Sequence, residues 1–211
     1  MMSGPYFGRW SAGDVYERRL DADWPDASDA TATSGLVLLP TSSIAYSGSS
    51  ASINPNGSIS FTAVTYISAG HFGSTYSNYL IDFRGQSSSA TGDPYFYIGT
   101  GAGASTTGWT YQYLAATSTS VTAARAGSGT SSAAYIADST ATQRIGFQMY
   151  LYGPYLAQPT AFRTVTVGDL SNAAIVDYAG THNVSTSYTS WGIAPFNGTI
   201  TGQISVYGFG E

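Results

Sequence analysis

The sequence has no cysteine and no lysine among its 211 residues. Without cysteine the chain can form no disulfide bond, no thiolate nucleophile and no thiolate metal site. Its seven basic residues are therefore all arginines, and with 12 acidic residues they give a formal net charge of −5. Nucleic-acid binding needs a basic surface that releases phosphate counterions, so this balance argues against a nucleic-acid partner.

Long apolar runs are missing as well. No segment reaches the about 18 apolar residues of a membrane-spanning helix. The N-terminal residues Met1 to Trp10 are polar, contain Gly and Pro, and lack the apolar run of a signal peptide. We therefore expect no membrane insertion, and we expect synthesis and folding in a cytoplasm.

Charged residues are few, at 9% of the chain, while apolar residues make up 43% and aromatic residues 14%. Disordered chains lack such a supply of apolar side chains, so the composition indicates a folded protein. Ser, Thr and Gly are poor helix formers, whereas Thr, Val, Ile and the 17 tyrosines suit a pleated sheet. Scarce charge also leaves little repulsion between copies, which favours a subunit packed among neighbours.

The composition changes near residue 30, because nine of the 19 charged residues lie in the first 30. The same segment holds isolated aromatics spaced by Gly and Pro, namely Tyr6, Phe7, Trp10, Tyr16 and Trp24. These aromatic side chains could each fill a pocket on another surface, but they are too few and too far apart to form a hydrophobic core of their own. Either it folds back over its own domain, or it is an extended arm whose aromatics insert into a partner protein, and we favour the arm. We thus divide the chain into an attachment arm (1–30), a Ser/Thr-rich connector (31–52) and a β domain (53–211).

Short segments of alternating polarity, separated by turn residues, predict about nine strands in the β domain. The clearest is 144–152, where Ile145, Phe147, Met149 and Leu151 alternate with polar or small residues. The others are 58–65, 78–84, 95–98, 109–114, 162–167, 174–178, 186–193 and 199–207. From this alternation we predict that eight side chains are buried: Phe61, Ile81, Phe83, Ile145, Phe147, Leu151, Ile204 and Val206.

Many short strands without a competing helical pattern predict an all-β fold, a two-sheet antiparallel sandwich of jelly-roll type. The tract 115–142 is rich in Ala, Ser, Thr and Gly, and we expect a long surface connection there with at most one edge strand.

The C-terminal segment Phe196-Asn-Gly-Thr-Ile-Thr-Gly-Gln-Ile-Ser-Val-Tyr-Gly-Phe209 resembles the closing strand of a broad family of phage virion proteins. These often end in a Gly-x-Ile-x-Val/Leu-Tyr-Gly pattern, and the resemblance extends through 56–61, 79–83 and 106–111 to most of residues 53–211. It implies a jelly roll in a tail fibre, tail tip or head decoration, often trimeric and often bound to cell-surface glycans.

Residues able to carry catalysis are few. Glycoside cleavage needs two carboxyls on either side of a sugar, about 5 Å or about 6.5 to 9.5 Å apart. The β domain offers Asp82, Asp93, Asp138, Asp169 and Asp177. Asp93 and Asp169 fall in turn sequences, where a carboxylate commonly caps its own backbone. For Asp82 and Asp177, within strands, the ordinary role is a salt bridge to Arg84, Arg144 or Arg163. His71 and His182 stand without a metal or triad motif. We predict no enzyme activity, no metal site and no cofactor.

Eight aromatic residues exceed what one core requires: Tyr95, Tyr97, Trp109, Tyr111, Tyr113, Tyr150, Tyr152 and Tyr155. Tyrosine offers an apolar body with a polar tip, which suits a core, a subunit interface or stacking on a sugar. All three roles stay open for this set.

These observations together predict a bacteriophage virion structural protein, a tail-fibre, tail-tip or capsid-decorating subunit. It would be made in the host cytoplasm, anchored to other virion proteins by residues 1–30, and homo-oligomeric, with a trimer favoured. The alternative is an adhesin that binds cell-surface polysaccharide, and a polysaccharide depolymerase is the third hypothesis.

Overall fold

The computed structural model describes residues 35–89, 92–100, 107–116, 120–131, 134–137, 144–168 and 174–210. Leu36–Glu211 forms one compact unit. The attachment arm predicted over residues 1–30, with Tyr6, Phe7, Trp10, Tyr16 and Trp24, lies outside the described residues.

The described part of the chain contains thirteen β-strands and no helix. All strand pairs are antiparallel. The strands are β1 (Val37–Leu38), β2 (Ile44–Ile53), β3 (Ile59–Gly70), β4 (Asn78–Ser87), β5 (Pro94–Gly99), β6 (Trp109–Ala116), β7 (Val121–Ser131), β8 (Ala134–Tyr135), β9 (Arg144–Tyr152), β10 (Thr160–Gly168), β11 (Ala174–His182), β12 (Ser190–Pro195) and β13 (Ile200–Phe209). The predicted all-β antiparallel sandwich is confirmed.

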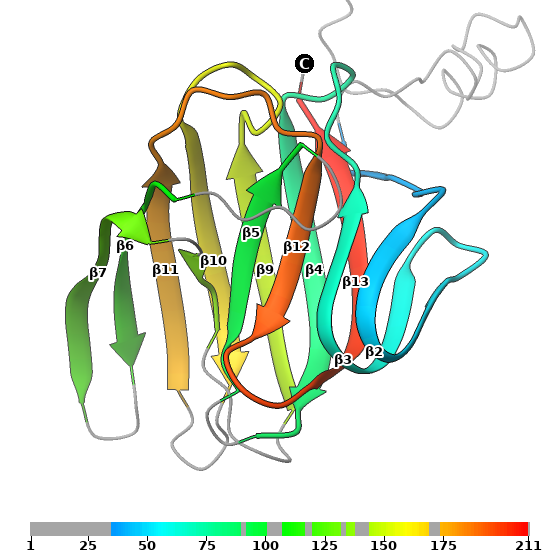
Figure 1. Ribbon diagram of the computed structural model, residues 1–211. Helices are drawn as coiled ribbons and strands as arrows, with labels where there is room; N and C mark the ends of the chain where they lie inside the picture. Colours follow the sequence, from blue (N-terminus) through cyan, green and yellow to red (C-terminus); the bar gives the residue numbers. More distant parts are fainter. Residues whose placement is uncertain are drawn as a thin grey trace, which may run out of the picture. The chain divides into compact units, whose positions relative to one another are not determined.

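The strands form one long sheet that folds over into two layers (Figure 1). The larger layer has the order β7-β6-β11-β10-β9-β4-β13, and the smaller has the order β12-β5-β8. β3 joins them: Ile59 to Val64 pair with β13, whereas Ile67 to Gly70 pair with β12. In Figure 1, β5 and β12 stand in front of β9 and β4.

A backbone irregularity marks the point where β3 changes layers. Ala63 has a positive φ of 45°, and the register of β13 shifts between Ile200 and Gly202. Such bulges bend a strand and leave one residue outside the ladder. The backbone N–H of Ala63 donates to the Thr201 hydroxyl at 2.9 Å, so the bulge leaves this donor satisfied.

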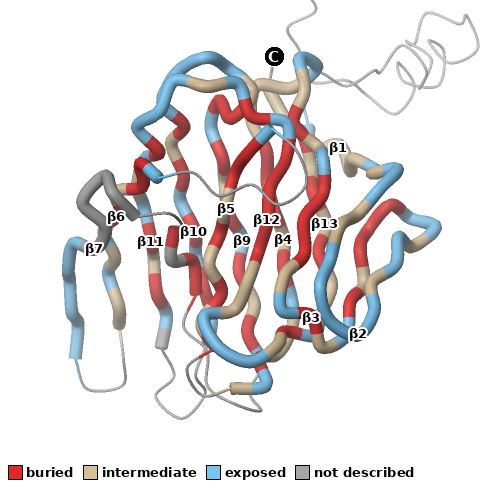
Figure 2. The backbone as a smooth tube through the Cα atoms, viewed as in Figure 1, coloured by how far each residue is buried: buried red, intermediate tan, exposed pale blue. Residues whose placement is uncertain are grey.

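The core lies between the layers, where the buried segments of both meet (Figure 2). Phe83 stacks between Phe61 and Phe147, with ring centroids 6.1 Å and 4.8 Å away. The Thr166 hydroxyl of β10 donates to the carbonyl of Ile136, just after β8, at 2.7 Å and ties the two layers together. All eight side chains predicted to be buried are buried.

Two sequence-based boundaries need correction. Residues 31–52, predicted to be a connector, include β1 and most of β2, and β2 pairs along the whole of β3. The Ser and Gly residues of β2 give no alternating apolar pattern from which a strand could be predicted. β2 is stabilised by pairing with β3 and not by a buried apolar row. The final part of the predicted strand 186–193 is β12, which begins at Ser190. The tract 115–142 also differs from the prediction of at most one edge strand, because it contains β7 and the short β8, which stand at the two ends of the strand order.

Candidate functional site

The outward-facing side chains of β13, β4 and β9 form a continuous surface that we call the outer strip. Because side chains alternate between the two faces of a strand, these residues point away from the core between the layers. In register across the three strands, the strip comprises Phe209, Asn78 and Tyr152; Tyr207, Leu80 and Tyr150; Ser205, Asp82 and Gln148; Gln203 and Arg84; and Thr201, Gln86 and Arg144.

One end of the outer strip is aromatic. Tyr150 and Tyr207 flank Leu80, which is only 4% exposed beneath them. The rings of Tyr150 and Phe209 meet edge to face at 6.1 Å, and Tyr152 beside them is 42% exposed. This end therefore presents aromatic rings with polar tips over an apolar floor, the surface that suits stacking on a sugar ring.

The middle of the strip is polar but carries no pair of catalytic carboxyls. Asp82 accepts a hydrogen bond from the Gln148 amide at 3.3 Å and has no arginine partner in the described residues. Asp177 pairs instead with Arg163, whose Nε donates at 3.1 Å, as expected for one of its three candidate arginines. Gln148 and Val165 stand in register between the two aspartates, a spacing of three strands or about 14 Å. That exceeds both carboxyl spacings used in glycoside cleavage.

The other end of the strip opens into a pocket of about 420 Å³, which we call the arginine pocket. It is lined by Arg84, Gly85, Gln86, Arg144, Ile145, Thr201, Gly202 and Gln203. Arg84 and Arg144 come from neighbouring strands, since Gln86 pairs with Arg144 and Arg84 pairs with Gly146. Gly146, opposite Arg84, adds no side chain to this face of β9.

Hydrogen bonds hold one wall of the arginine pocket in place. Arg84 Nε donates to Gln203 Oε1 at 3.0 Å, and Gln203 Nε2 donates to the buried hydroxyl of Ser58 at 2.7 Å. Asn54 and Asn56, at the turn before β3, bond the same Ser58 hydroxyl at 2.9 Å and 2.7 Å. The network orients the Gln203 amide oxygen toward Arg84 and so fixes that guanidinium.

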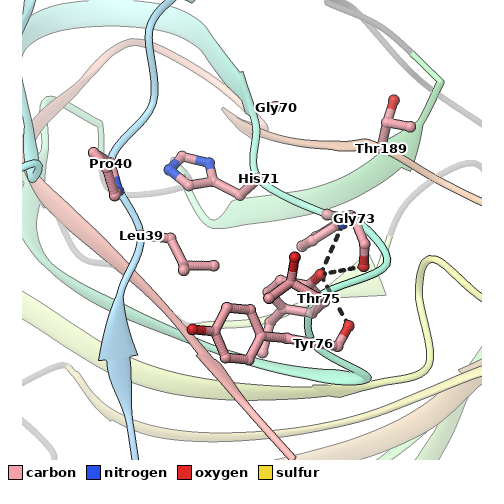
Figure 3. A pocket seen from close by; sticks show the side chains of 10 residues that line it. Leu39, Pro40, Gly70, His71, Gly73, Thr75, Tyr76 and Thr189 are labelled. Atoms are coloured by element: carbon pink, nitrogen blue, oxygen red, sulfur yellow. Dashed lines mark hydrogen bonds between the residues drawn. The ribbon is translucent and has the colours of Figure 1, made fainter. Parts of the chain in front are cut away.

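A second pocket, of about 450 Å³, lies beside His71 (Figure 3). The Trp191 indole donates to His71 Nδ1 at 2.9 Å, and because an indole nitrogen only donates, the neutral ring must carry its proton on Nε2. Burial lowers the pKa of His71 to about 4, partly offset by a hydrogen bond to the Leu39 backbone. The Tyr79 hydroxyl binds the backbone of Gly73 and Tyr76. The hydrogen bonds here serve packing, and the lining includes no carboxylate or arginine.

The eight aromatics singled out from the sequence divide between surface and core. Tyr150 and Tyr152 lie on the outer strip, whereas Trp109 and Tyr111 are buried, which corrects their candidacy as surface residues. Tyr113, from the same row, packs on Tyr178 at 5.8 Å. The reason is that β6 turns this row inward, and alternation alone does not tell which of two faces is the inner one.

The remaining three lie elsewhere. Tyr95 and Tyr97 alternate with the buried Phe96 and Ile98 on β5, so they stand on the outer face of the smaller layer. Burial raises the pKa of both phenols, and nearby Asp93 adds to the effect on Tyr95. Tyr155 is half-buried against the core.

The sequence pattern does not mark Arg84, Arg144, Gln203, Tyr207 or Phe209 as a site. Their only signal was a position on the polar side of an alternating strand, which most surface residues share. Over the described residues, no group of three or more His, Asp or Glu side chains is arranged to hold a metal ion. Nor does that part of the chain contain a helix with the length and apolarity needed to cross a bilayer.

Neither a protein-family model nor a curated protein matches this chain. Among solved structures, a protein of unknown function from Shewanella oneidensis MR-1 is similar over 97% of both chains, at 13% identity and a TM-score of 0.26. A likeness at this level carries no argument about function, so the function has to be argued from the site itself.

Proposed function

We propose that this chain is a non-enzymatic bacteriophage virion protein, a tail or capsid-decorating subunit, whose β-sandwich binds cell-surface polysaccharide along the outer strip. The observation that carries the binding role is an aromatic cluster, the exposed Tyr152 with the half-buried Tyr150, Tyr207 and Phe209, in continuous register with hydrogen-bonding side chains. The proposal joins a structural role in the particle with the adhesin role.

The shape of the strip suits a chain-like ligand. Tyr150 lies six positions after Arg144 on β9, a span of about 20 Å at the rise of a β-strand. Aromatic rings at one end would stack on sugar faces, and Asp82, Gln148 and Ser205 in the middle offer acceptors and donors for sugar hydroxyls. A small ligand would instead be enclosed in a concave apolar pocket.

Support for the virion context comes from the sequence. The closing strand 196–209 resembles that of phage virion jelly rolls, and residues 1–30 combine isolated aromatics with clustered charge, as an attachment arm would. Each such aromatic contributes roughly 1.5 to 3 kcal/mol when it fills a pocket on a partner. In the proposal, the arm attaches the subunit to other virion proteins and the sandwich faces outward.

The binding role is tested by substituting an aromatic of the strip in the full chain. Tyr150→Ala should weaken binding to the recognised bacterial-surface polysaccharide at least tenfold, about 1.4 kcal/mol, because the stacking surface is lost. Binding is measured by affinity electrophoresis through gels containing surface polysaccharides from candidate hosts.

The matched control is Tyr46→Ala, because Tyr46 is 44% exposed on β2, away from the strip. It should bind like the unsubstituted chain. Equal binding by Tyr150→Ala and the unsubstituted chain, or no retardation in any such gel, would rule out polysaccharide binding through this surface.

A further inference from the structure

The positive charge of the described residues is unevenly placed. Four arginines lie in this part of the chain, namely Arg84, Arg125, Arg144 and Arg163. Arg163 is neutralised by Asp177, whereas Arg84 and Arg144 both line the arginine pocket, whose lining includes no carboxylate. In a chain with a formal net charge of −5, this concentrates two positive charges in one hollow at the end of the outer strip.

The two guanidinium groups are differently engaged. Arg84 donates from Nε and from Nη2 to the neutral Gln203 amide, which orients it but leaves its charge uncompensated. The Arg144 side chain makes no hydrogen bond or ion pair with any described residue. Its planar fork can bind two oxygens of one carboxylate at once, the geometry for which arginine is better suited than lysine.

Other polar groups complete the pocket. Gln86 and Thr201 stand in register with Arg144 along the last row of the strip, and Gln203 is held by the Ser58 network. Hydrogen-bond donors therefore surround a hollow of about 420 Å³, large enough for a sugar ring with its charged substituent.

From this arrangement we propose that the arginine pocket binds the carboxylate of an acidic polysaccharide whose chain lies along the outer strip. The inference rests on the proposed function and adds the ligand class, a polymer of uronic-acid type instead of a neutral glycan. Gln203 is a positioning residue in this scheme, because it acts through Arg84. Sulfate esters share the negative charge of a carboxylate but not its planar two-oxygen geometry. The test therefore compares a carboxylate polymer with a sulfated polymer.

The test uses the full chain and three polymers as probes: polygalacturonate, its methyl ester, which removes the charge, and dextran sulfate. We expect polygalacturonate to bind at least tenfold more tightly than its methyl ester, and more tightly than dextran sulfate at equal ionic strength. Arg144→Gln should lose at least tenfold for polygalacturonate, and Arg144→Lys, which keeps the charge without the fork, should recover only part of that loss.

Arg125→Gln is the matched control, since it removes one exposed positive charge from β7, outside the arginine pocket. It should bind polygalacturonate unchanged. Thermal unfolding of every variant shows whether the fold is intact, and Arg84→Gln supplies a second variant of the pocket should Arg144→Gln fail to fold.

The outcomes separate this inference from the function on which it rests. Equal binding of the ester and the acid, with binding still dependent on Tyr150, would overturn the acidic preference and leave polysaccharide binding in place. Binding of galacturonate monomer that depends on Arg144, without polymer binding, would support the pocket and refute the polysaccharide function. If Arg125→Gln and Arg144→Gln weakened polygalacturonate binding equally, the effect would come from the net charge of the protein and not from the pocket. That result would overturn the inference.

Discussion

At the scale of single residues, close contacts in the folded structure explain why glycine stands at positions 202 and 208. The sequence pattern alone does not show these contacts. A Cβ at Gly202 would lie 2.4 Å from the backbone oxygen of Arg84, and one at Gly208 would lie 2.4 Å from the ring of Tyr76. Real Cβ atoms almost never come this close to a neighbour, so a side chain at either position would force the neighbouring atoms to move. The Gly-x-Ile-x-Val-Tyr-Gly pattern thus marks two close approaches to β13, at Gly202 by backbone and at Gly208 by an aromatic ring.

Gly202→Ala should therefore destabilise the fold by about 1 to 3 kcal/mol, because the obstructing atoms belong to the β4 backbone and cannot rotate away. Gly146→Ala is the matched control: the nearest atom to its Cβ is 3.5 Å away, an ordinary contact, so the change should stay within about 0.5 kcal/mol. Urea unfolding midpoints of both variants provide the comparison. Equal midpoints would show that β13 and β4 separate easily.

At the scale of elements, His71 joins two strands that are far apart in the sequence. Its ring accepts from Trp191 on β12 and bonds the backbone of Leu39, directly after β1. Protonation of Nδ1 would replace that acceptor with a second donor and break the Trp191 hydrogen bond. The hydrogen bond between His71 and Trp191 on β12 therefore depends on pH.

The pH dependence has a definite sign. The pKa of His71 is lowered in the folded state to about 4 from 6.5, so between these values the unfolded chain binds the proton more readily. His71 should contribute its full stability above pH 6.5, and that contribution should be lost as the pH falls to 4, by at most about 3 kcal/mol. Denaturant titrations of the native chain and of His71→Gln across this range test it. Parallel pH profiles for the two proteins would refute the assignment.

A comparison of β9 with β2 explains why some strands can be predicted from the sequence and others cannot. β9 has a buried side chain at every second position, and its bounds agree with the prediction at both ends. β2 has none, because its residues are exposed or half-buried along its whole length. A strand that is held by one neighbour and leaves no apolar row has no periodic signal to detect.

At the scale of the whole molecule, the outer face of the larger layer carries an apolar patch distinct from the outer strip. Val167, Ile175 and Val121 stand in one row of β10, β11 and β7, and Val165 and Leu114 stand in the next row. Their side chains are 39% to 70% exposed. Asp177, paired with Arg163, stands between Val165 and Leu114 in the second row, so the first row is the more apolar of the two. Exposed apolar side chains gathered in this way favour a protein interface, and because little charge opposes association we predict that a second copy of the chain binds there.

We accordingly expect a homo-oligomer in solution, with a trimer favoured. The double substitution of Val167 and Ile175 to Gln should shift the molar mass measured by light scattering toward the monomer, since it removes the centre of the patch. Val184→Gln is the control, because Val184 is 40% exposed in the loop between β11 and β12. A monomeric native chain throughout the micromolar range would contradict self-association.

The sequence by itself determined the class of fold and much of the core. The alternation in 144–152 and the apolar row of Phe61, Phe83 and Phe147 predict strands with one buried face, because burial of apolar side chains is a local property of each segment. Only the tertiary structure decided which faces meet solvent and which strands are neighbours. The strip that unites Arg84, Arg144 and Gln203 depends on pairing between segments about 60 to 120 residues apart, and antiparallel pairing of that range leaves no mark on either segment alone. The same limit explains Trp109 and Tyr111, whose row alternates as regularly as Tyr150 and Tyr152 but packs inward because β6 lies against the other layer.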